Sequence, residues 1–163
     1  MFGIGIIKQD VEMSPEIKGR LTEDGKPIIG ATIAHSIVYE GFKKRQELLQ
    51  YDTTNGAGHF TFPEVAIKSH HPKGLLGQNS RVSMRVYFER NSDIHQLWYS
   101  SSSRMPLAKP VVAQLKNLDC DLNNSKIQYE FDTSVFSEEK ALVVISICKL
   151  TNEWISQSFV IEE

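Results

Sequence analysis

The sequence predicts an all-β protein: a two-sheet, Greek-key-like β-sandwich of about seven to nine strands, forming one domain over residues 1–163. Apolar residues alternate with polar ones over many short segments that are separated by turn residues, a pattern typical of half-buried strands. Helical periodicity does not extend beyond two turns anywhere in the chain. A chain of 163 residues is also long enough to bury a core without disulfides or metal ions.

The charge balance argues against two classes of partner. The chain carries 18 basic and 20 acidic residues, so its net charge of −2 provides no overall field for nucleic acid or an anionic membrane. Its apolar runs are all shorter than a membrane-spanning helix. The first residues lack the basic start and the small-residue cleavage site of an export signal, so we expect a cytoplasmic protein.

The two cysteines, Cys120 and Cys148, are too few and too far apart to indicate a disulfide framework or a zinc site. Because the cytoplasm is reducing, we expect them to be buried thiols. Their side chains would be able to meet if their two strands paired.

Residues 16–33 are expected to form the hairpin around which the sandwich is organised, after a first strand at 4–13. Residues 23–25 (Glu-Asp-Gly) supply its tight turn. Pro27 fits only an edge or a strand entry, because proline has no amide hydrogen for a ladder. Gly19 and Gly30 interrupt the two arms, which indicates a bulge or a close backbone approach.

The remaining strands are predicted from their alternation and turns. A polar connection at 40–47 leads to a second hairpin, 49–53 with 59–62, across a turn at 55–58; residues 66–79 form a loop with one short helical turn. Hairpins at 81–99 and 118–131 flank a serine-rich connection at 100–110. The apolar run 141–150 suits a strand covered on both faces, and 154–161 is the last strand. The predicted core comprises Leu21, Ile33, Phe60, Phe62, Val82, Val86, Leu122, Val144 and Ile147.

The first two hairpins carry a family resemblance. Residues 25–33 (Gly-Lys-Pro-Ile-Ile-Gly-Ala-Thr-Ile) follow Gly19, and residues 53–62 (Thr-Thr-Asn-Gly-Ala-Gly-His-Phe-Thr-Phe) come some twenty residues later. This order resembles the carboxypeptidase-regulatory-like, transthyretin-like β-sandwich over residues 16–63. It departs from the family pattern at Asn55, where aspartate is commoner, and at the long connection 40–47.

Short motifs also resemble small stand-alone bacterial proteins that look like immunity partners of type VI secretion effectors. These motifs are Met-Ser-Pro at 13–15, Gln-Leu-Trp at 96–98 and Leu-Asp-Cys-Asp-Leu at 118–122. The resemblance implies a non-enzymatic, cytoplasmic protein that neutralises a cognate antibacterial toxin by direct binding. Two alternatives remain: a transthyretin-like small-molecule hydrolase, whose C-terminal Tyr-Arg-Gly-Ser this chain lacks, and an accessory structural domain.

Candidate catalytic and metal-binding residues have ordinary structural explanations. The serines at 100–103 lack a nucleophile elbow, and the adjacent His70 and His71 point to opposite sides of an extended segment. Asp119 and Asp121 share a strand face, which suits either calcium binding or an outward polar face. We therefore expect no cofactor, no metal and no catalytic site. Aromatic residues on turns or outer faces are typical of protein contacts: Phe42, Tyr87, Trp98, which fits the core equally well, and Tyr99.

The two long connections, 40–47 and 66–79, are the predicted toxin-binding loops, because recognition is commonly carried by loops on a rigid scaffold. Leu75 and Leu76 suit either an interface core or a cap on the end of the sandwich. The predicted partner-binding residues are Phe42, Lys43, Lys44, Arg45, His70, His71, Lys73, Leu75 and Leu76.

Overall fold

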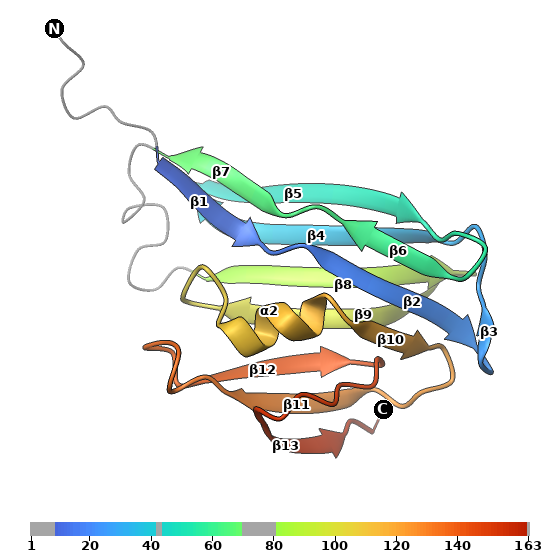
Figure 1. Cartoon of the computed structure of the whole chain (residues 1–163). Helices are drawn as coiled ribbons and strands as arrows, with labels where there is room; N and C mark the ends of the chain where they lie inside the picture. The colour runs from blue at the N-terminus through green and yellow to red at the C-terminus, as the bar shows by residue number, and fades with distance from the viewer. Residues whose placement is uncertain (1–8, 42–43, 70–80, 163) are drawn as a thin grey trace, which may run out of the picture.

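The computed structural model describes residues 9–41, 44–69 and 81–162 (Figure 1). These residues form 13 strands and one short helix, so the predicted all-β sandwich is confirmed with more strands than expected. The strands are β1 (Gln9–Ser14), β2 (Ile17–Glu23), β3 (Lys26–Pro27), β4 (Thr32–Gly41), β5 (Lys44–Thr53), β6 (His59–Phe62), β7 (Val65–Ser69), β8 (Val82–Arg90), β9 (Asp93–Ser102), β10 (Leu118–Asp121), β11 (Ile127–Asp132), β12 (Ala141–Ser146) and β13 (Ile155–Val160). The helix is α2 (Lys109–Leu115).

Two layers make up the sandwich. One layer is a seven-stranded antiparallel sheet in the order β13-β11-β12-β9-β8-β4-β5, which we call the large sheet. The other layer combines the β1-β7 pair, a smaller sheet in which β2 pairs with β10, β3 and β6, and the helix α2. Figure 1 shows all of these elements on one side of the large sheet. The described residues include no helix of a length and apolarity that would span a membrane.

The predicted hairpins at 16–33, 49–62 and 118–131 are not hairpins within one sheet. The first strand of each pair and the second lie in different layers: β2 and β4, β5 and β6, β10 and β11. In the first case β2 pairs with β3 over only two residue pairs, and the chain then crosses to the large sheet. Alternation shows which face of a strand is buried, but it does not show which strand lies beside it.

Thr54 fixes the crossover between β3 and β4. Its hydroxyl donates to the carbonyl of Ile28 at 2.7 Å and accepts from the amide of Ala31 at 2.8 Å. Gly30, between them, has φ +74°, a left-handed conformation that glycine adopts at little cost. Gly30 therefore lies in a connection between sheets rather than at the predicted bulge.

Gly19 confirms the predicted close approach. A Cβ atom at this position would lie 2.4 Å from Cζ of Phe60. Pro27 also lies as expected, in the two-residue edge strand β3.

The core lies between the two layers, and all nine predicted core residues are buried. Its main cluster surrounds Trp98, which is fully buried, so the core alternative for this residue is the right one. Leu97 is an extra residue opposite the Val86–Tyr87 step of β8, which forms a β-bulge. The bulge explains why two successive residues, Leu97 and Trp98, both point inward.

Three further expectations need correction. Residues 40–47 are largely strand, because β4 extends to Gly41 and β5 begins at Lys44. The serine-rich segment is also partly strand, since β9 continues to Ser102. The run 141–150 is not one strand covered on both faces: β12 ends at Ser146 and has exposed residues on one face. Residues 147–149 then cross from the large sheet to β10, where the amide of Lys149 donates to the carbonyl of Asp119.

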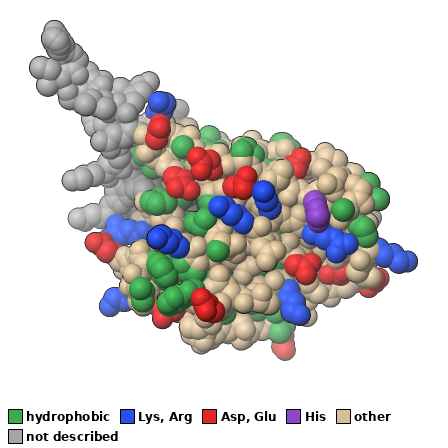
Figure 2. Space-filling model, viewed as in Figure 1, with side chains coloured by type: hydrophobic (Ala, Val, Ile, Leu, Met, Phe, Trp, Pro, Cys, Tyr) green, Lys and Arg blue, Asp and Glu red, His purple; other side chains and the backbone are tan. Residues whose placement is uncertain are grey.

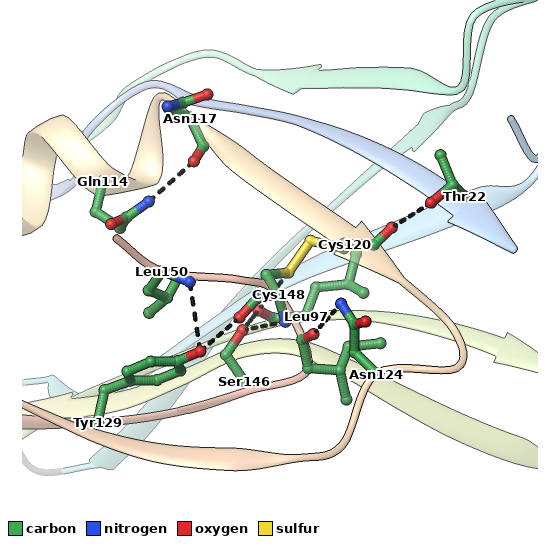
Figure 3. Close-up of a disulfide and its surroundings, with 11 residues drawn as sticks. Thr22, Leu97, Gln114, Asn117, Cys120, Asn124, Tyr129, Ser146, Cys148 and Leu150 are labelled. Carbon is green, nitrogen blue, oxygen red and sulfur yellow. Dashed lines mark hydrogen bonds between the residues drawn. A yellow bond between two sulfur atoms is a disulfide. The ribbon is translucent and has the colours of Figure 1, made fainter. Parts of the chain in front are cut away.

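This crossing brings the two cysteines together (Figure 3). Cys120 and Cys148 form an isolated antiparallel bridge with a Cα–Cα distance of 4.0 Å, and their sulfur atoms are bonded. The expectation of two free buried thiols is therefore wrong. The pairing of the two segments places the sulfur atoms within bonding distance. The disulfide connects β10 of the smaller sheet to the segment that leaves β12 of the large sheet.

Candidate protein-binding face

Only two of the nine predicted partner-binding residues, Lys44 and Arg45, are among the described residues. Lys44 and Arg45 are the first residues of β5, where Arg45 is exposed. They therefore belong to a regular hairpin and not to a long loop. The other predicted residues lie outside the described residues, and they stay predictions: Phe42, Lys43, His70, His71, Lys73, Leu75 and Leu76.

The large sheet has a second face, directed away from the other layer. Its side chains are the alternate residues of each strand whose neighbours along the strand point into the core. Residues at the same level on neighbouring strands form a continuous row across all seven strands, because the registers of the six ladders connect. The row consists of Leu49, Ser36, Arg85, Tyr99, Ile145, Gln128 and Phe159. At the usual spacing of strands it is roughly 29 Å wide.

A second, shorter row adds two tyrosines beside the first. Tyr51 on β5 lies opposite Ala34, and Ala34 lies opposite Tyr87 on β8. The guanidinium of Arg85 lies over the ring of Tyr87, with Cζ 4.8 Å from the ring centroid. This cation–π contact holds an arginine and an aromatic ring in fixed positions on the sheet.

Several of these side chains are accessible although they are large and apolar. Tyr51 is 62 % exposed, Phe159 54 % and Leu49 43 %, while Tyr87 and Tyr99 are half-buried. We call this set the outer face; its members are Leu49, Tyr51, Arg85, Tyr87, Tyr99, Ile145 and Phe159. Tyrosine and arginine are enriched among the residues that dominate binding energy at protein interfaces.

The sequence contained part of this signal. Tyr87 and Tyr99 are among the aromatic residues predicted to lie on turns or outer faces, and the structure places both on the same face of the large sheet. Leu49 and Tyr51 alternate with Gln50 and Asp52 in a pattern typical of a half-buried strand, and the inward side of β5 carries Gln50. Gln50 faces the core, where its Oε1 lies 3.2 Å from Nδ1 of the buried His35.

A groove of about 740 Å³ lies on the opposite side of the molecule, on the second layer. Its lining mixes basic residues such as Lys18 and Lys116 with acidic ones such as Asp119. Other polar groups in it already have partners: Arg20 donates through Nε to the carbonyl of Ala57 at 3.0 Å. Figure 2 shows basic and acidic side chains intermingled on this side of the molecule. The groove therefore presents no single sign of charge to a ligand.

Asp121 has a structural role in the fold. Its carboxylate accepts hydrogen bonds from the hydroxyl of Thr22 at 2.7 Å and from the amides of Gly25 and Asn123 at 2.9 and 3.0 Å. The bond from the Gly25 amide is the main reason why the pKa of Asp121 falls from 3.8 to about 2. Asp121 thus remains ionised and holds the β2–β3 turn.

The serines near the end of β9 also have structural partners. Ser100 accepts a hydrogen bond from the indole nitrogen of Trp98 at 2.9 Å. Ser102 and Ser103 donate through their hydroxyls to the carboxylate of Glu139 at 2.8 and 2.6 Å. Within the part of the chain that the structure describes, no group of three or more His, Cys, Asp or Glu residues is arranged to hold a metal ion.

His35 is the buried histidine of the fold. It lies under the ring of Phe62, with the ring centroids 5.2 Å apart, and its Nε2 has no hydrogen-bond partner among the described residues. Desolvation lowers the pKa of His35 from 6.5 to about 4, although the contact with Gln50 opposes this shift. His35 is therefore neutral at pH 7 and belongs to the core.

Comparisons with known proteins give one match. A family model described as a domain of unknown function, DUF6795, matches residues 17–125, which is more than half of the chain. The matched segment runs from the start of β2 past the end of β10, so β11, β12 and β13 follow it. Neither the curated proteins nor the solved structures that were searched gave a match. The chain belongs to the DUF6795 family.

Proposed function

We propose that this protein is a non-enzymatic protein-binding module whose partner is a cognate antibacterial effector, and that it neutralises this toxin by direct contact. The effector as partner comes from the sequence resemblance to type VI secretion immunity proteins. We propose the outer face of the large sheet as the main contact surface, because of the geometry described above.

The observation that carries the proposal is the row of side chains from Leu49 to Phe159, which crosses all seven strands and includes five members of the outer face. A sheet face is rigid because each strand is held by its neighbours, so its backbone loses little conformational freedom when a partner binds. The guanidinium of Arg85 is already held over Tyr87. Such a preorganised aromatic and arginine surface, with polar residues around it, resembles the centre of a protein interface.

Three polar groups among the described residues hold the fold, which supports a binding role more than a chemical one. Asp121 caps the β2–β3 turn, Glu139 anchors two serines, and His35 packs against Phe62. The predicted toxin-binding connections, 40–47 and 66–79, stay a second candidate contact. The cytoplasm is the proposed compartment, where the thiol state of Cys120 and Cys148 would depend on how well the buried bond resists reduction.

Co-expression with the product of the neighbouring gene tests this function. We expect the protein to co-purify with that product and to restore growth of cells in which the product is toxic. The variants Phe42→Ala with Lys44→Glu, and separately Leu75→Ser with Leu76→Ser, test the predicted loops. The double variant Tyr51→Ala with Tyr87→Ala tests the outer face.

Loss of co-purification in the outer-face variant alone is the expected result. Ile29→Ala is the matched control, because Ile29 is 66 % exposed and Tyr51 is 62 % exposed, but Ile29 lies in the β3–β4 connection. Growth rescue that survives the outer-face variant and fails in a loop variant would move the site to the loops. A neighbouring product that neither binds nor harms cells would contradict the immunity role.

A further inference from the structure

The edge of the large sheet at β5 is long and regular. β5 has ten residues, and its ladder with β4 runs through all of them without a register shift. The opposite edge strand, β13, has six residues and a shift at Glu130/Phe131. β5 contains no proline or bulge, two of the features by which natural proteins protect an edge from pairing, although it does carry the charged residues Arg45, Glu47 and Asp52.

The backbone groups that β5 directs away from β4 belong to its odd-numbered residues. The amide of Thr54 donates to the carbonyl of Ala31, which sets the phase of the hydrogen-bonded pairs. Hydrogen-bonded pairs alternate along an antiparallel ladder, so the even-numbered residues of β5 face β4. The odd-numbered residues are all exposed and make no backbone hydrogen bond to another element among the described residues: Arg45, Glu47, Leu49, Tyr51 and Thr53.

A strand that pairs with itself about a twofold axis perpendicular to the sheet keeps its outward side chains outward. Odd-numbered residues must then lie opposite odd-numbered residues of the second copy. An axis through Leu48 satisfies this condition and places Arg45 opposite Tyr51 of the other copy, at both ends of the pairing. The arginine–tyrosine pair that results is the pair already formed within β8, where Arg85 lies over Tyr87.

The inner side of β5 favours the same axis. Leu48 points toward the second layer, where it packs against the smaller core cluster together with Val65 and Ile67 of β7. All three are only partly buried, because no described strand lies beyond β5. With the axis through Leu48, the leucines of the two copies lie opposite each other and extend this cluster.

We propose that β5 pairs antiparallel with β5 of a second copy of this chain, about a twofold axis through Leu48, so that the two large sheets form one continuous sheet. The outer faces of both copies then lie on the same side of that sheet. The dimer would present two toxin-binding faces side by side, but the pairing itself does not depend on the proposed function.

Sedimentation velocity over a range of protein concentrations tests the dimer. We expect wild type to sediment as a dimer and Leu49→Pro as a monomer, because this proline removes an amide hydrogen that points to the open edge and leaves the β4 ladder intact. Ser158→Pro is the matched control on the other edge. The bond from the Ile161 amide to the Lys126 carbonyl shows which pairs of that ladder are hydrogen-bonded. The backbone amide of Ser158 therefore points away from β11, to the open edge. Circular dichroism checks that both variants fold.

Charge substitutions test the register without relying on proline. Tyr51→Lys places a lysine opposite Arg45 twice per dimer and should weaken the dimer roughly tenfold. Adding Arg45→Glu to the same chain creates opposite charges at both positions and should restore dimerisation. A monomeric wild type, or a folded Leu49→Pro that remains dimeric, would overturn the proposal. Failure of the double variant to recover would overturn the axis through Leu48.

Discussion

The carboxylate of Asp121 accepts a 2.9 Å hydrogen bond from the amide of Gly25, although the two residues are 96 positions apart in the chain. β10 runs parallel to β2, which brings its last residue to the β2–β3 turn. A strand from the later part of the chain therefore fixes a turn near its beginning.

We expect Asp121→Asn to reduce the free energy of unfolding by about 1–2 kcal/mol at neutral pH, because it weakens a cap with several hydrogen bonds. Asp119→Asn is the control: Asp119 lies two residues earlier, is exposed and makes no side-chain hydrogen bond within the described residues. The pKa of Asp121 is depressed from 3.8 to about 2, so its contribution is present above pH 3.8 and is lost as the pH falls toward 2. Urea denaturation at a series of pH values measures both effects. Equal stability of the two variants would contradict the capping role.

His35 should make the protein less stable in mild acid. Its pKa in the folded protein is about 4 against an ordinary value of 6.5, so the unfolded chain binds more protons between these values. Stability should be complete above pH 6.5 and fall as the pH drops to 4, by on the order of 3 kcal/mol. The variant His35→Leu should lack this part of the pH dependence in denaturant titrations. A slope identical to that of wild type would show that His35 titrates normally.

Gly30→Val should lower stability by about 1–3 kcal/mol, since a β-branched residue strongly disfavours a φ of +74°. A Cβ at Gly30 would meet no atom within 4 Å, so the cost arises from the backbone and not from crowding. Gly30→Asn should therefore lose much less, because asparagine tolerates the left-handed region. Thermal melts of the two variants make the comparison, and equal melting temperatures would contradict the explanation.

Reduction of the disulfide should destabilise the fold. The bond closes a segment with a sequence separation of 28, for which the chain-entropy model gives about 3.5 kcal/mol. Denaturation with and without a reductant measures this difference, and Cys120→Ser with Cys148→Ser provides the matched variant that no reductant affects. Titration of free thiols in protein extracted from the cytoplasm under alkylation would show whether the bond exists there.

The sequence predicted the buried faces well and the strand partners poorly. Every predicted core residue is buried, including Val82 and Val86 of the alternating strand β8. β4, β6 and β11 each lie in a different layer from the strand with which a hairpin was predicted, which is β2, β5 and β10 respectively. This placement depends on crossovers such as the one fixed by Thr54. Local periodicity contains no information on such long-range pairing.

The same limit explains what was missed at the candidate site. Tyr51 belongs to an alternating pattern, which does not show by itself which of its two sides is buried. The contact between His35 and Gln50 shows that Gln50 faces inward and Tyr51 outward. The row that connects Leu49 to Phe159 depends on six registers, none of which is visible in one strand's sequence. α2 was missed because its seven residues include Pro110 and are too few to show a period.

The central claim is that the outer face binds a protein toxin. The most direct measurement is the dissociation constant for the product of the neighbouring gene, determined by calorimetry for wild type, Tyr51→Ala with Tyr87→Ala, and Ile29→Ala. We expect the outer-face variant to bind at least about 30-fold more weakly, as for the loss of an interface hot spot, while Ile29→Ala binds like wild type. Wild-type affinity in the folded outer-face variant would contradict the account.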